Sequence, residues 1–274
     1  MQCCQLDQLT EYMFRMFSFS QLNLSYAFTQ HLLLLTQPIQ YYKNIRTHKQ
    51  IKNIYYRDDP SFNCIQLVIL FVACVIWCGI FGLTRATFTW YQFIRNTFGV
   101  VLIEYIVLAF IISYGMKLLA DRYIRDTNNN ISTDVSYAYA LDIHFNAMTF
   151  IITLLVIIQF LLLPILYISP DEYNQLSITQ SLVYTGTSNL LYCVAFVYYI
   201  YISWLGYALL TTNTQFKRVL YYCVSTVATL CTVSTLFNFN IMLFILSKYY
   251  DLSSSNIHHV DTASTTITSA DTQT

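Results

Sequence analysis

The sequence predicts an all-α protein, a polytopic transmembrane helical bundle with five spans that are preceded by an interfacial amphipathic helix. The first observation is the low share of charged residues, 10% of the chain, against about 25% in a typical soluble domain. The second is a series of five long, nearly uncharged apolar stretches, because about 20 such residues cross a hydrocarbon core of roughly 30 Å. A lipid-exposed backbone must satisfy its own hydrogen bonds, so these stretches are expected to be helices.

The five spans are separated by short polar connections. We expect them at residues 61–84, 96–116, 143–168, 182–210 and 219–247, within a membrane domain over residues 61–250. The second stretch contains one carboxylate, Glu104, and the third contains only His144 near its start. Residues 251–274 are rich in Ser and Thr and cannot bury a core, which predicts a disordered tail.

The distribution of Lys and Arg predicts the orientation, because cytoplasmic loops of membrane proteins carry an excess of these residues. A five-span path places eleven of the 14 basic residues on the side of the N-terminus and leaves Arg85, Arg95 and Lys248 on the other side. We therefore expect the N-terminus in the cytoplasm and the C-terminus in the lumen or exterior. Scattered cations and a net charge of zero argue against a nucleic-acid partner, which would need a basic stripe.

Residues 1–60 are expected to form a cytoplasmic segment that contains the interfacial helix. Residues 16–42 carry no Lys, Arg, Asp or Glu. If these residues form a helix, its hydroxyl groups lie on one face: Ser18, Ser25, Thr29 and Thr36. Its apolar groups lie on another face, roughly a quarter turn away: Phe17, Leu24, Phe28 and Leu35. This pattern is typical of a helix in the membrane plane. A sixth span is the alternative, but it would break the charge asymmetry.

Two motifs lie between this helix and the first span. A basic stretch comes first and consists of Lys43, Arg46, Lys49 and Lys52. These residues are candidate lipid contacts, since juxtamembrane cations attract anionic lipid by about 1 kcal/mol each. The alternative is that they are only the positive charges that set the orientation of the spans. The second motif is Arg57-Asp58-Asp59-Pro60. Acidic residues followed by proline are typical of a helix start, but that role does not explain the arginine. The motif is a candidate partner-binding corner.

Polar residues at the start of the third span invite a metal or catalytic hypothesis. Asp142 shares a helix face with Asn146, whereas His144, two residues on, points to nearly the opposite side. No HExxH, paired carboxylates or CxxC completes a site. We therefore expect a polar cap where the span meets the membrane surface, and no catalytic residue, metal or cofactor.

Glu104 lies near the middle of the second span. A charged residue there costs about 2.5–3.5 kcal/mol, which the surrounding Leu, Ile, Val and Phe residues offset. An ion or proton site is one interpretation. The other is a carboxyl group that is hydrogen-bonded to a neighbouring helix, with Asn189 or Asn238 as its partner.

Several strings along the chain keep the order and spacing of one known family. They are Lys49-Gln50-Ile51-Lys52 with Arg57-Asp58-Asp59-Pro60-Ser61-Phe62, then Tyr139-Ala140-Leu141-Asp142-Ile143-His144-Phe145-Asn146-Ala147, then Gly186-Thr187-Ser188-Asn189-Leu190, Tyr198–Tyr201 and Leu205-Gly206-Tyr207, and finally Asn238-Phe239. In this combination the chain resembles the uncoordinated-50 family of Golgi membrane proteins from about Thr36 to Tyr250.

The resemblance implies a five-span protein of the Golgi membrane with its N-terminus in the cytosol. It also implies a role in the trafficking of assembled cell-surface receptors, nicotinic acetylcholine receptors especially, and association with exchange factors for Arf GTPases. The family has no assigned catalytic residues, so the resemblance implies none here. Two hypotheses follow. One is a non-enzymatic trafficking factor that recruits such partners through its basic segment and the Arg57–Pro60 corner, while its spans hold cargo or lipid. The other is a small transporter, channel or lipid-handling protein that uses Glu104.

Overall fold

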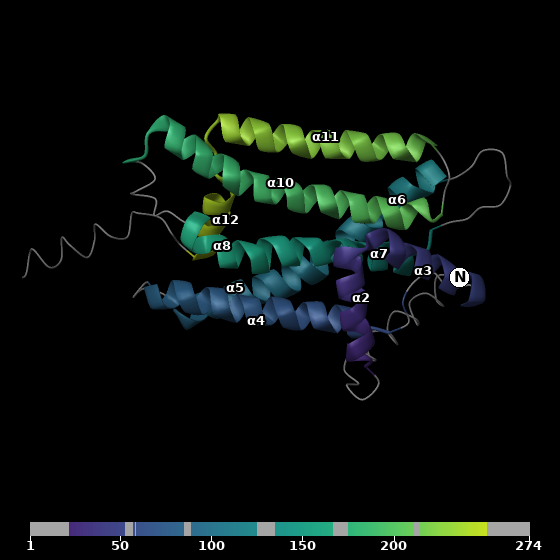
Figure 1. Ribbon diagram of the computed structural model, residues 1–274. Coiled ribbons are helices and arrows are strands. Elements are labelled where there is room, and N and C mark those ends of the chain that lie inside the picture. The colour runs from purple at the N-terminus through teal and green to yellow at the C-terminus, as the bar shows by residue number, and fades with distance from the viewer. Residues whose placement is uncertain are drawn as a thin grey trace, which may run out of the picture.

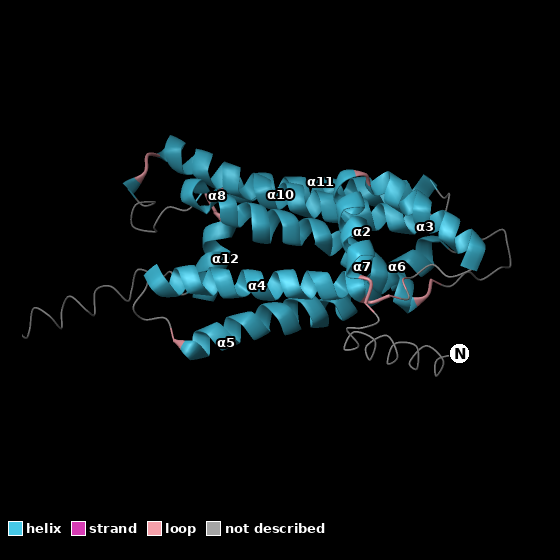
Figure 2. Cartoon of the chain, turned by 60° about the horizontal axis from the view of Figure 1, so that its bottom comes forward, coloured by secondary structure: helices cyan, strands magenta, loops and turns pink. Residues whose placement is uncertain are grey.

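The computed structural model describes residues 22–52, 57, 59–84, 89–124, 135–166, 175–210 and 214–250. Regular structure in these residues is entirely helical (Figure 2). Five helical stretches are long and apolar enough to cross a membrane: Ser61–Phe81, Trp90–Arg122, Tyr137–Leu166, Ile178–Ala208 and Arg218–Leu236. The predicted class, an all-α five-span membrane protein, is confirmed.

The first span has its predicted bounds, while the next three begin four to six residues earlier than predicted and the second also ends eight residues later. The first is α4, Ser61–Thr84. The second joins α5, Trp90–Phe98, a π-helical segment η2, Gly99–Val107, and α6, Leu108–Ile124. The third joins α7, Tyr137–Ile151, the π-helical η3, Ile152–Ile158, and α8, Gln159–Leu166. The fourth is α10, Ile178–Ala208. Helix α7 lies at the centre, since eleven of its 15 residues are buried.

The last apolar stretch differs from the prediction of one helix over residues 219–247. Helix α11 covers Thr214–Leu236, and a separate helix, α12, covers Ile241–Tyr250. Between them Asn238 takes a left-handed conformation with φ 55°, which asparagine tolerates at helix ends. Helix α12 packs its buried Met242 and Leu246 against Trp77 of α4 and Tyr192 of α10. The stretch is apolar enough for one span, but a polar turn divides it.

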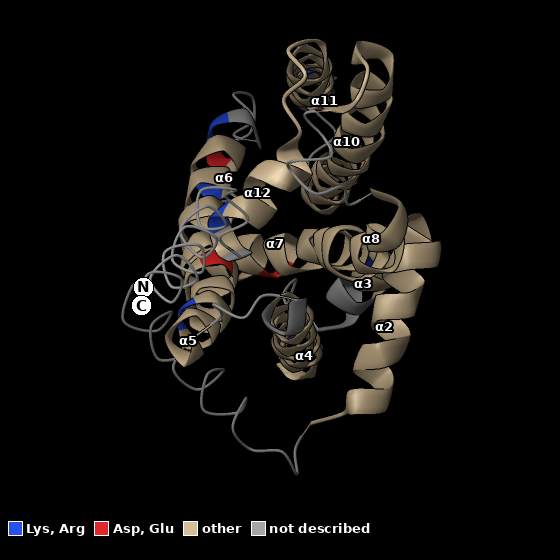
Figure 3. Ribbon diagram, turned by 90° about the vertical axis from the view of Figure 1, so that its left-hand side faces the viewer, with Lys and Arg blue, Asp and Glu red and all other residues tan. Residues whose placement is uncertain are grey.

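The segment before the spans forms two helices, where one interfacial helix was expected. Helix α2 covers Leu24–Thr36 and α3 covers Pro38–Lys52. Proline 38 explains the break, because it lacks the N–H that a continuous helix needs and is favoured at the first helical position. With 13 residues, α2 is too short for a sixth span. It runs across the direction of α4 (Figures 1 and 3), as a helix in the membrane plane would; its place in a membrane stays a prediction.

The non-spanning helices lie at opposite ends of the bundle. Helices α2 and α3 lie at one end of the spans and α12 at the other (Figure 1). Helix α11 packs mainly against α10, and the two run side by side in Figures 1 and 3. The predicted tail over residues 251–274 lies outside the described residues.

Candidate functional site

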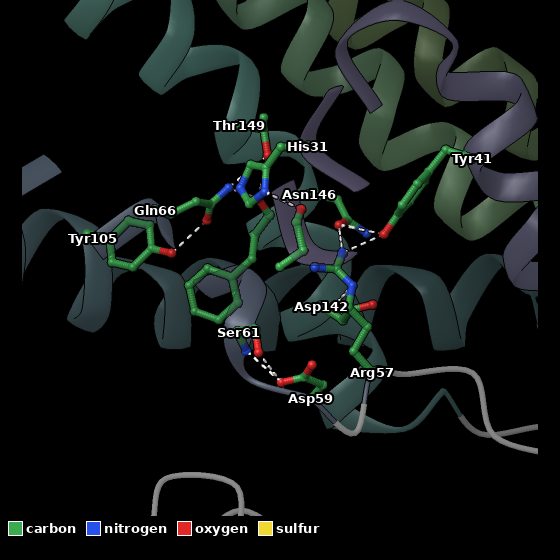
Figure 4. Close-up of polar contacts among 12 residues, drawn as sticks. His31, Tyr41, Arg57, Asp59, Ser61, Gln66, Tyr105, Asp142, Asn146 and Thr149 are labelled. Carbon is green, nitrogen blue, oxygen red and sulfur yellow. Dashed lines mark hydrogen bonds and ion pairs between the residues drawn. The ribbon is translucent and has the colours of Figure 1, made fainter. Parts of the chain in front are cut away.

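An ion pair between Arg57 and Asp142 is the centre of the candidate site. Arg57 Nε lies 3.3 Å from Asp142 Oδ1, and the two side chains are only 11% and 9% exposed. Arg57 precedes α4, while Asp142 lies in the second turn of α7 (Figure 4). The arginine that a helix start did not explain therefore neutralises the buried carboxylate at the start of the third span.

Two further side chains bind the guanidinium group. Arg57 Nη2 donates hydrogen bonds to the hydroxyl oxygen of Tyr41, at 2.5 Å, and to Asn146 Oδ1. The Tyr41 hydroxyl also donates to Asn146 Oδ1, at 3.2 Å. Asp142 and Asn146 lie one turn apart on the same face of α7, as their spacing predicted. These contacts join α3 to α7 through the residue that precedes α4.

Phe62 stacks against the same guanidinium group and extends the contacts to α2. Arg57 Cζ lies 3.6 Å from the centroid of the Phe62 ring, which is a cation–π geometry. The His31 ring stacks on Phe62 at 3.7 Å with an interplanar angle of 15°. Both groups cannot occupy one face of the ring at these distances, so Phe62 lies between them. We call Tyr41, Arg57, Phe62, Asp142 and Asn146 the Arg57 cluster.

Burial sets the protonation of the two groups that α2 and α3 contribute. Desolvation lowers the pKa of His31 to about 4, although a hydrogen bond to the Ala27 carbonyl raises it in part and the charge of Arg57 lowers it further. His31 is therefore neutral at neutral pH and does not repel Arg57. Burial also raises the pKa of Tyr41, so its hydroxyl keeps the proton that it donates to Asn146.

The other residues of the Arg57–Pro60 motif have a different role. Asp59 Oδ1 accepts hydrogen bonds from the backbone N–H of Ser61, at 2.9 Å, and from the Ser61 hydroxyl. Pro60 is buried, and its carbonyl accepts the first helical hydrogen bond of α4 from Cys64 N–H. Asp59 and Pro60 thus start α4 as the sequence indicated, whereas Asp58 lies outside the described residues.

His144 does not join Asp142. Its Nδ1 lies 2.7 Å from the Tyr199 hydroxyl on α10, on the side of α7 away from the Arg57 cluster. Among the residues that the structure describes, no group of three or more His, Cys, Asp and Glu could hold a metal ion. The arrangement of Asp142, His144 and Asn146 links three helices and offers no paired acid and base.

The sequence analysis missed a second set of buried contacts beside the cluster. Gln66 Nε2 donates to the Phe145 carbonyl at 2.9 Å and to Thr149 Oγ1 at 2.7 Å, while Tyr105 donates to Gln66 Oε1 at 2.6 Å (Figure 4). These bonds connect α4, α7 and η2. The available signal was a glutamine five residues into an apolar span, which needs a partner when it is buried.

Asn189 and Asn238 hold the turn between α11 and α12. Asn189 Nδ2 donates to Ser234 Oγ, Thr235 Oγ1 and the Phe239 carbonyl, at 2.9–3.1 Å, and its Oδ1 accepts the N–H of Ile241 at 3.0 Å. Asn238 is hydrogen-bonded to Thr185 and Ser181 of α10. Both side-chain amides therefore form hydrogen bonds that join α10 to the turn between α11 and α12.

Glu104 is not bonded to either asparagine, contrary to the interpretation that it pairs with one of them. Its side chain is exposed on η2, and none of the described residues makes a hydrogen bond with its carboxyl group. The asparagines are unavailable to it because the α11–α12 turn occupies their polar atoms. Glu104 and the Arg57 cluster are separate features.

Comparison with known proteins identifies the chain. A family model described as the UNC-50 family matches residues 12–250. The chain belongs to the UNC-50 family. It is 29% identical over 244 residues to a Dictyostelium discoideum protein named Protein unc-50 homolog, covering 88% of this chain and 87% of that one. A Homo sapiens protein of the same name is 32% identical over 201 residues, covering 73% and 71%. No solved structure matches.

In this UNC-50 family chain, strings that are far apart in the sequence meet in space. The string with Arg57 and Phe62 contacts the string with Asp142 and Asn146. The string with Asn189 likewise contacts Asn238-Phe239, through the Phe239 carbonyl. The family match also begins well before Thr36, where the quoted strings led us to start the resemblance, so it includes all of α2.

The basic stretch of this family member lies on α3. Lys43 and Arg46 are exposed, while the Lys49 and Lys52 side chains lie outside the described residues. Tyr41 lies on the same helix and is 2% exposed. Helix α3 therefore presents cations to the surroundings while the Arg57 cluster fixes its inner face.

Proposed function

We propose that this UNC-50 family protein is a non-enzymatic Golgi membrane protein that assists vesicular trafficking of cell-surface membrane proteins. In this proposal its N-terminus is cytoplasmic and its C-terminus lumenal. Helix α3 forms part of a cytoplasmic surface that recruits exchange factors for Arf GTPases, and the spans hold membrane-receptor cargo or lipid. Membership of the family is the observation that carries the proposal.

The Arg57 cluster supports a recruiting surface at this end of the bundle. A helix with exposed cations would move freely on the membrane unless something held its inner face. Tyr41 of α3 is held by Arg57 and Asn146, so Lys43 and Arg46 project from a fixed helix. A fixed basic surface suits an acidic protein partner, because little ordering is needed on binding. The same cations are suited to anionic lipid.

Location is the first test. A tagged copy expressed at native level should coincide with Golgi markers, whereas residence at the plasma membrane would contradict the proposal.

Capture of partners is the second test. We expect the full-length protein in mild detergent to retain Arf exchange factors in a pull-down, and K43A/R46A to retain several-fold less. The matched control is R122A/R218A, which removes two exposed cations that the charge distribution places on the same side of the membrane. Equal loss in both variants would indicate general electrostatic attraction, and no loss in K43A/R46A would exclude α3 as the binding surface.

A second candidate function, a small transporter, channel or lipid-handling protein, is favoured by one observation. Glu104 is exposed on the nine-residue π-helical segment η2, and such segments are frequent at functional sites. In proteoliposomes, E104Q should then abolish a measurable ion or lipid flux while leaving Golgi residence unchanged. A normal flux in E104Q would remove this candidate.

A further inference from the structure

We propose that α2 is a sensor of lipid packing defects, an in-plane helix whose exposed apolar side chains favour loosely packed, curved bilayers. Such a helix would bind the acyl chains that gaps between lipid headgroups expose. This inference does not rest on the proposed recruitment of exchange factors. It rests on three properties of α2: its depth in the bundle, the division of its surface, and its lack of charge.

The depth of α2 is given by the residues that it contacts. Its buried Ala27 and Leu34 belong to one cluster with Phe62 of α4 and Ile202 of α10. Phe62 is the second residue of α4, and Ile202 lies six residues before the end of α10, a rise of roughly 9 Å. Helix α2 therefore lies just inside the ends of the spans. Amphipathic helices at the boundary of headgroups and acyl chains are found at depths of about 5–10 Å.

Three faces of α2 bear on this proposal, and the remaining sector carries Tyr26, which is 50% exposed, with the partly buried Gln30 and Leu33. Ala27, His31 and Leu34 form the buried face. Roughly a quarter turn away, the bulky side chains Leu24, Phe28 and Leu32 form a stripe at four-residue spacing, and they are 52%, 57% and 48% exposed. The next face around the helix carries exposed hydroxyl groups: Ser25, Thr29 and Thr36. A helix at the boundary of headgroups and acyl chains contacts the bundle with one face, the acyl chains with the next and the headgroups with the third. The buried, apolar and hydroxyl faces of α2 follow one another in this order.

The absence of charge decides which membrane property α2 would detect. Residues 16–42 contain no Lys, Arg, Asp or Glu, and the first cation after them is Lys43 on α3. A helix that binds anionic lipid normally carries Lys or Arg on its polar face. Ser and Thr provide no such attraction, so the affinity of α2 must come from apolar insertion, which is sensitive to curvature and lipid composition. A protein with this helix should concentrate where a membrane is curved.

The second possible occupant of the stripe is another copy of the chain. Leu24, Phe28 and Leu32 lie at the depth of the bilayer surface, where lipid surrounds any face that the bundle does not cover. A dimer through α2 would make enrichment on curved membranes depend on protein density, which the experiment below measures.

The test uses the fluorescently labelled full-length protein in giant vesicles of dioleoyl phosphatidylcholine, which contain no anionic lipid. A membrane tube is pulled from each vesicle, and the protein-to-lipid fluorescence ratio in the tube is divided by that of the flat membrane. We expect this ratio to rise several-fold as the tube narrows. In L24S/F28S it should fall to about 1, because the stripe is lost.

The matched control is L236S/F237S, which exchanges one Leu and one Phe that are 72% and 81% exposed at the other end of the bundle. It should keep the enrichment of the natural chain. Both variants change exposed side chains, so both should unfold at the same temperature as the natural chain. Equal enrichment in L24S/F28S and the natural chain would overturn the proposal. So would enrichment that requires phosphatidylserine and disappears in K43A/R46A, or enrichment that scales with protein density.

Discussion

The Arg57–Asp142 pair leads to the sharpest prediction for folding. Arg57→Met removes the cation but keeps an unbranched apolar chain beneath Phe62, and it leaves the Asp142 carboxylate, 9% exposed, without its partner. Asp142→Asn removes the carboxylate charge instead. The double variant removes both charges together.

The expected magnitudes follow from the geometry. At 3.3 Å and an effective dielectric constant of about 20, the attraction is about 5 kcal/mol before desolvation. Desolvation offsets much of it, yet breaking a buried pair from one side costs about 3–5 kcal/mol. We therefore expect R57M to lower the free energy of unfolding by about 3–5 kcal/mol. D142N should cost about 2 kcal/mol, because the guanidinium keeps Tyr41 and Asn146. R57M/D142N should cost no more than R57M alone.

Equilibrium unfolding in mixed micelles measures these values, with a thiol-reactive dye as reporter in a chain that keeps only Cys74 and Cys78, because these two are buried while Cys223 is exposed in the folded chain. Arg218→Met, which removes an exposed cation, is the control and should stay within about 0.5 kcal/mol of the natural chain. If the cost in the double variant equals the sum of the single costs, the two residues are not coupled and the reasoning fails.

Three further predictions concern other contacts. His31 has a pKa of about 4 when α2 is docked, against an ordinary value of about 6.5. The docking of α2 is therefore most stable above pH 6.5 and weakens by up to about 3 kcal/mol as the pH falls to 4. Hydrogen exchange in α2 measures this change, and H31F should remove the pH dependence that His31 causes. Gly206→Ala would place a Cβ 2.7 Å from Ile143 Cγ1 and should lower the free energy of unfolding by about 1–3 kcal/mol; the loss should be smaller in an Ile143→Ala background, which lacks Cγ1. Asn189→Leu leaves Ile241 N–H without its acceptor and should cost about 2–3 kcal/mol, with faster hydrogen exchange in α12 but not in α2.

The spans could be predicted because their length and lack of charge are local properties of the sequence. The break in the last stretch could not, because no strong helix breaker stands between Leu236 and Ile241. It depends on Asn189, which accepts the Ile241 N–H and donates to the Phe239 carbonyl. That partner lies on another helix, and the register between two helices is not visible in hydropathy.

The same limit applies to the candidate site. Spacing placed Asp142 and Asn146 on one face, and the proline and acidic residues placed the start of α4. Nothing local related Arg57 to either, since the pair forms only when Arg57 comes to lie against α7. The sequence analysis did not single out His31, whose stacking on Phe62 contributes to the buried face of α2.

Polar residues of the family strings thus hold separate elements of the bundle together. The bilayer supplies no hydrogen-bond partners, so a buried guanidinium or amide fixes one arrangement of the elements that satisfy it. The Arg57 cluster fixes α2 and α3 at one end of the spans, and Asn189 fixes α12 at the other (Figure 1). We therefore interpret the strings as the means by which the bundle holds its non-spanning helices in place.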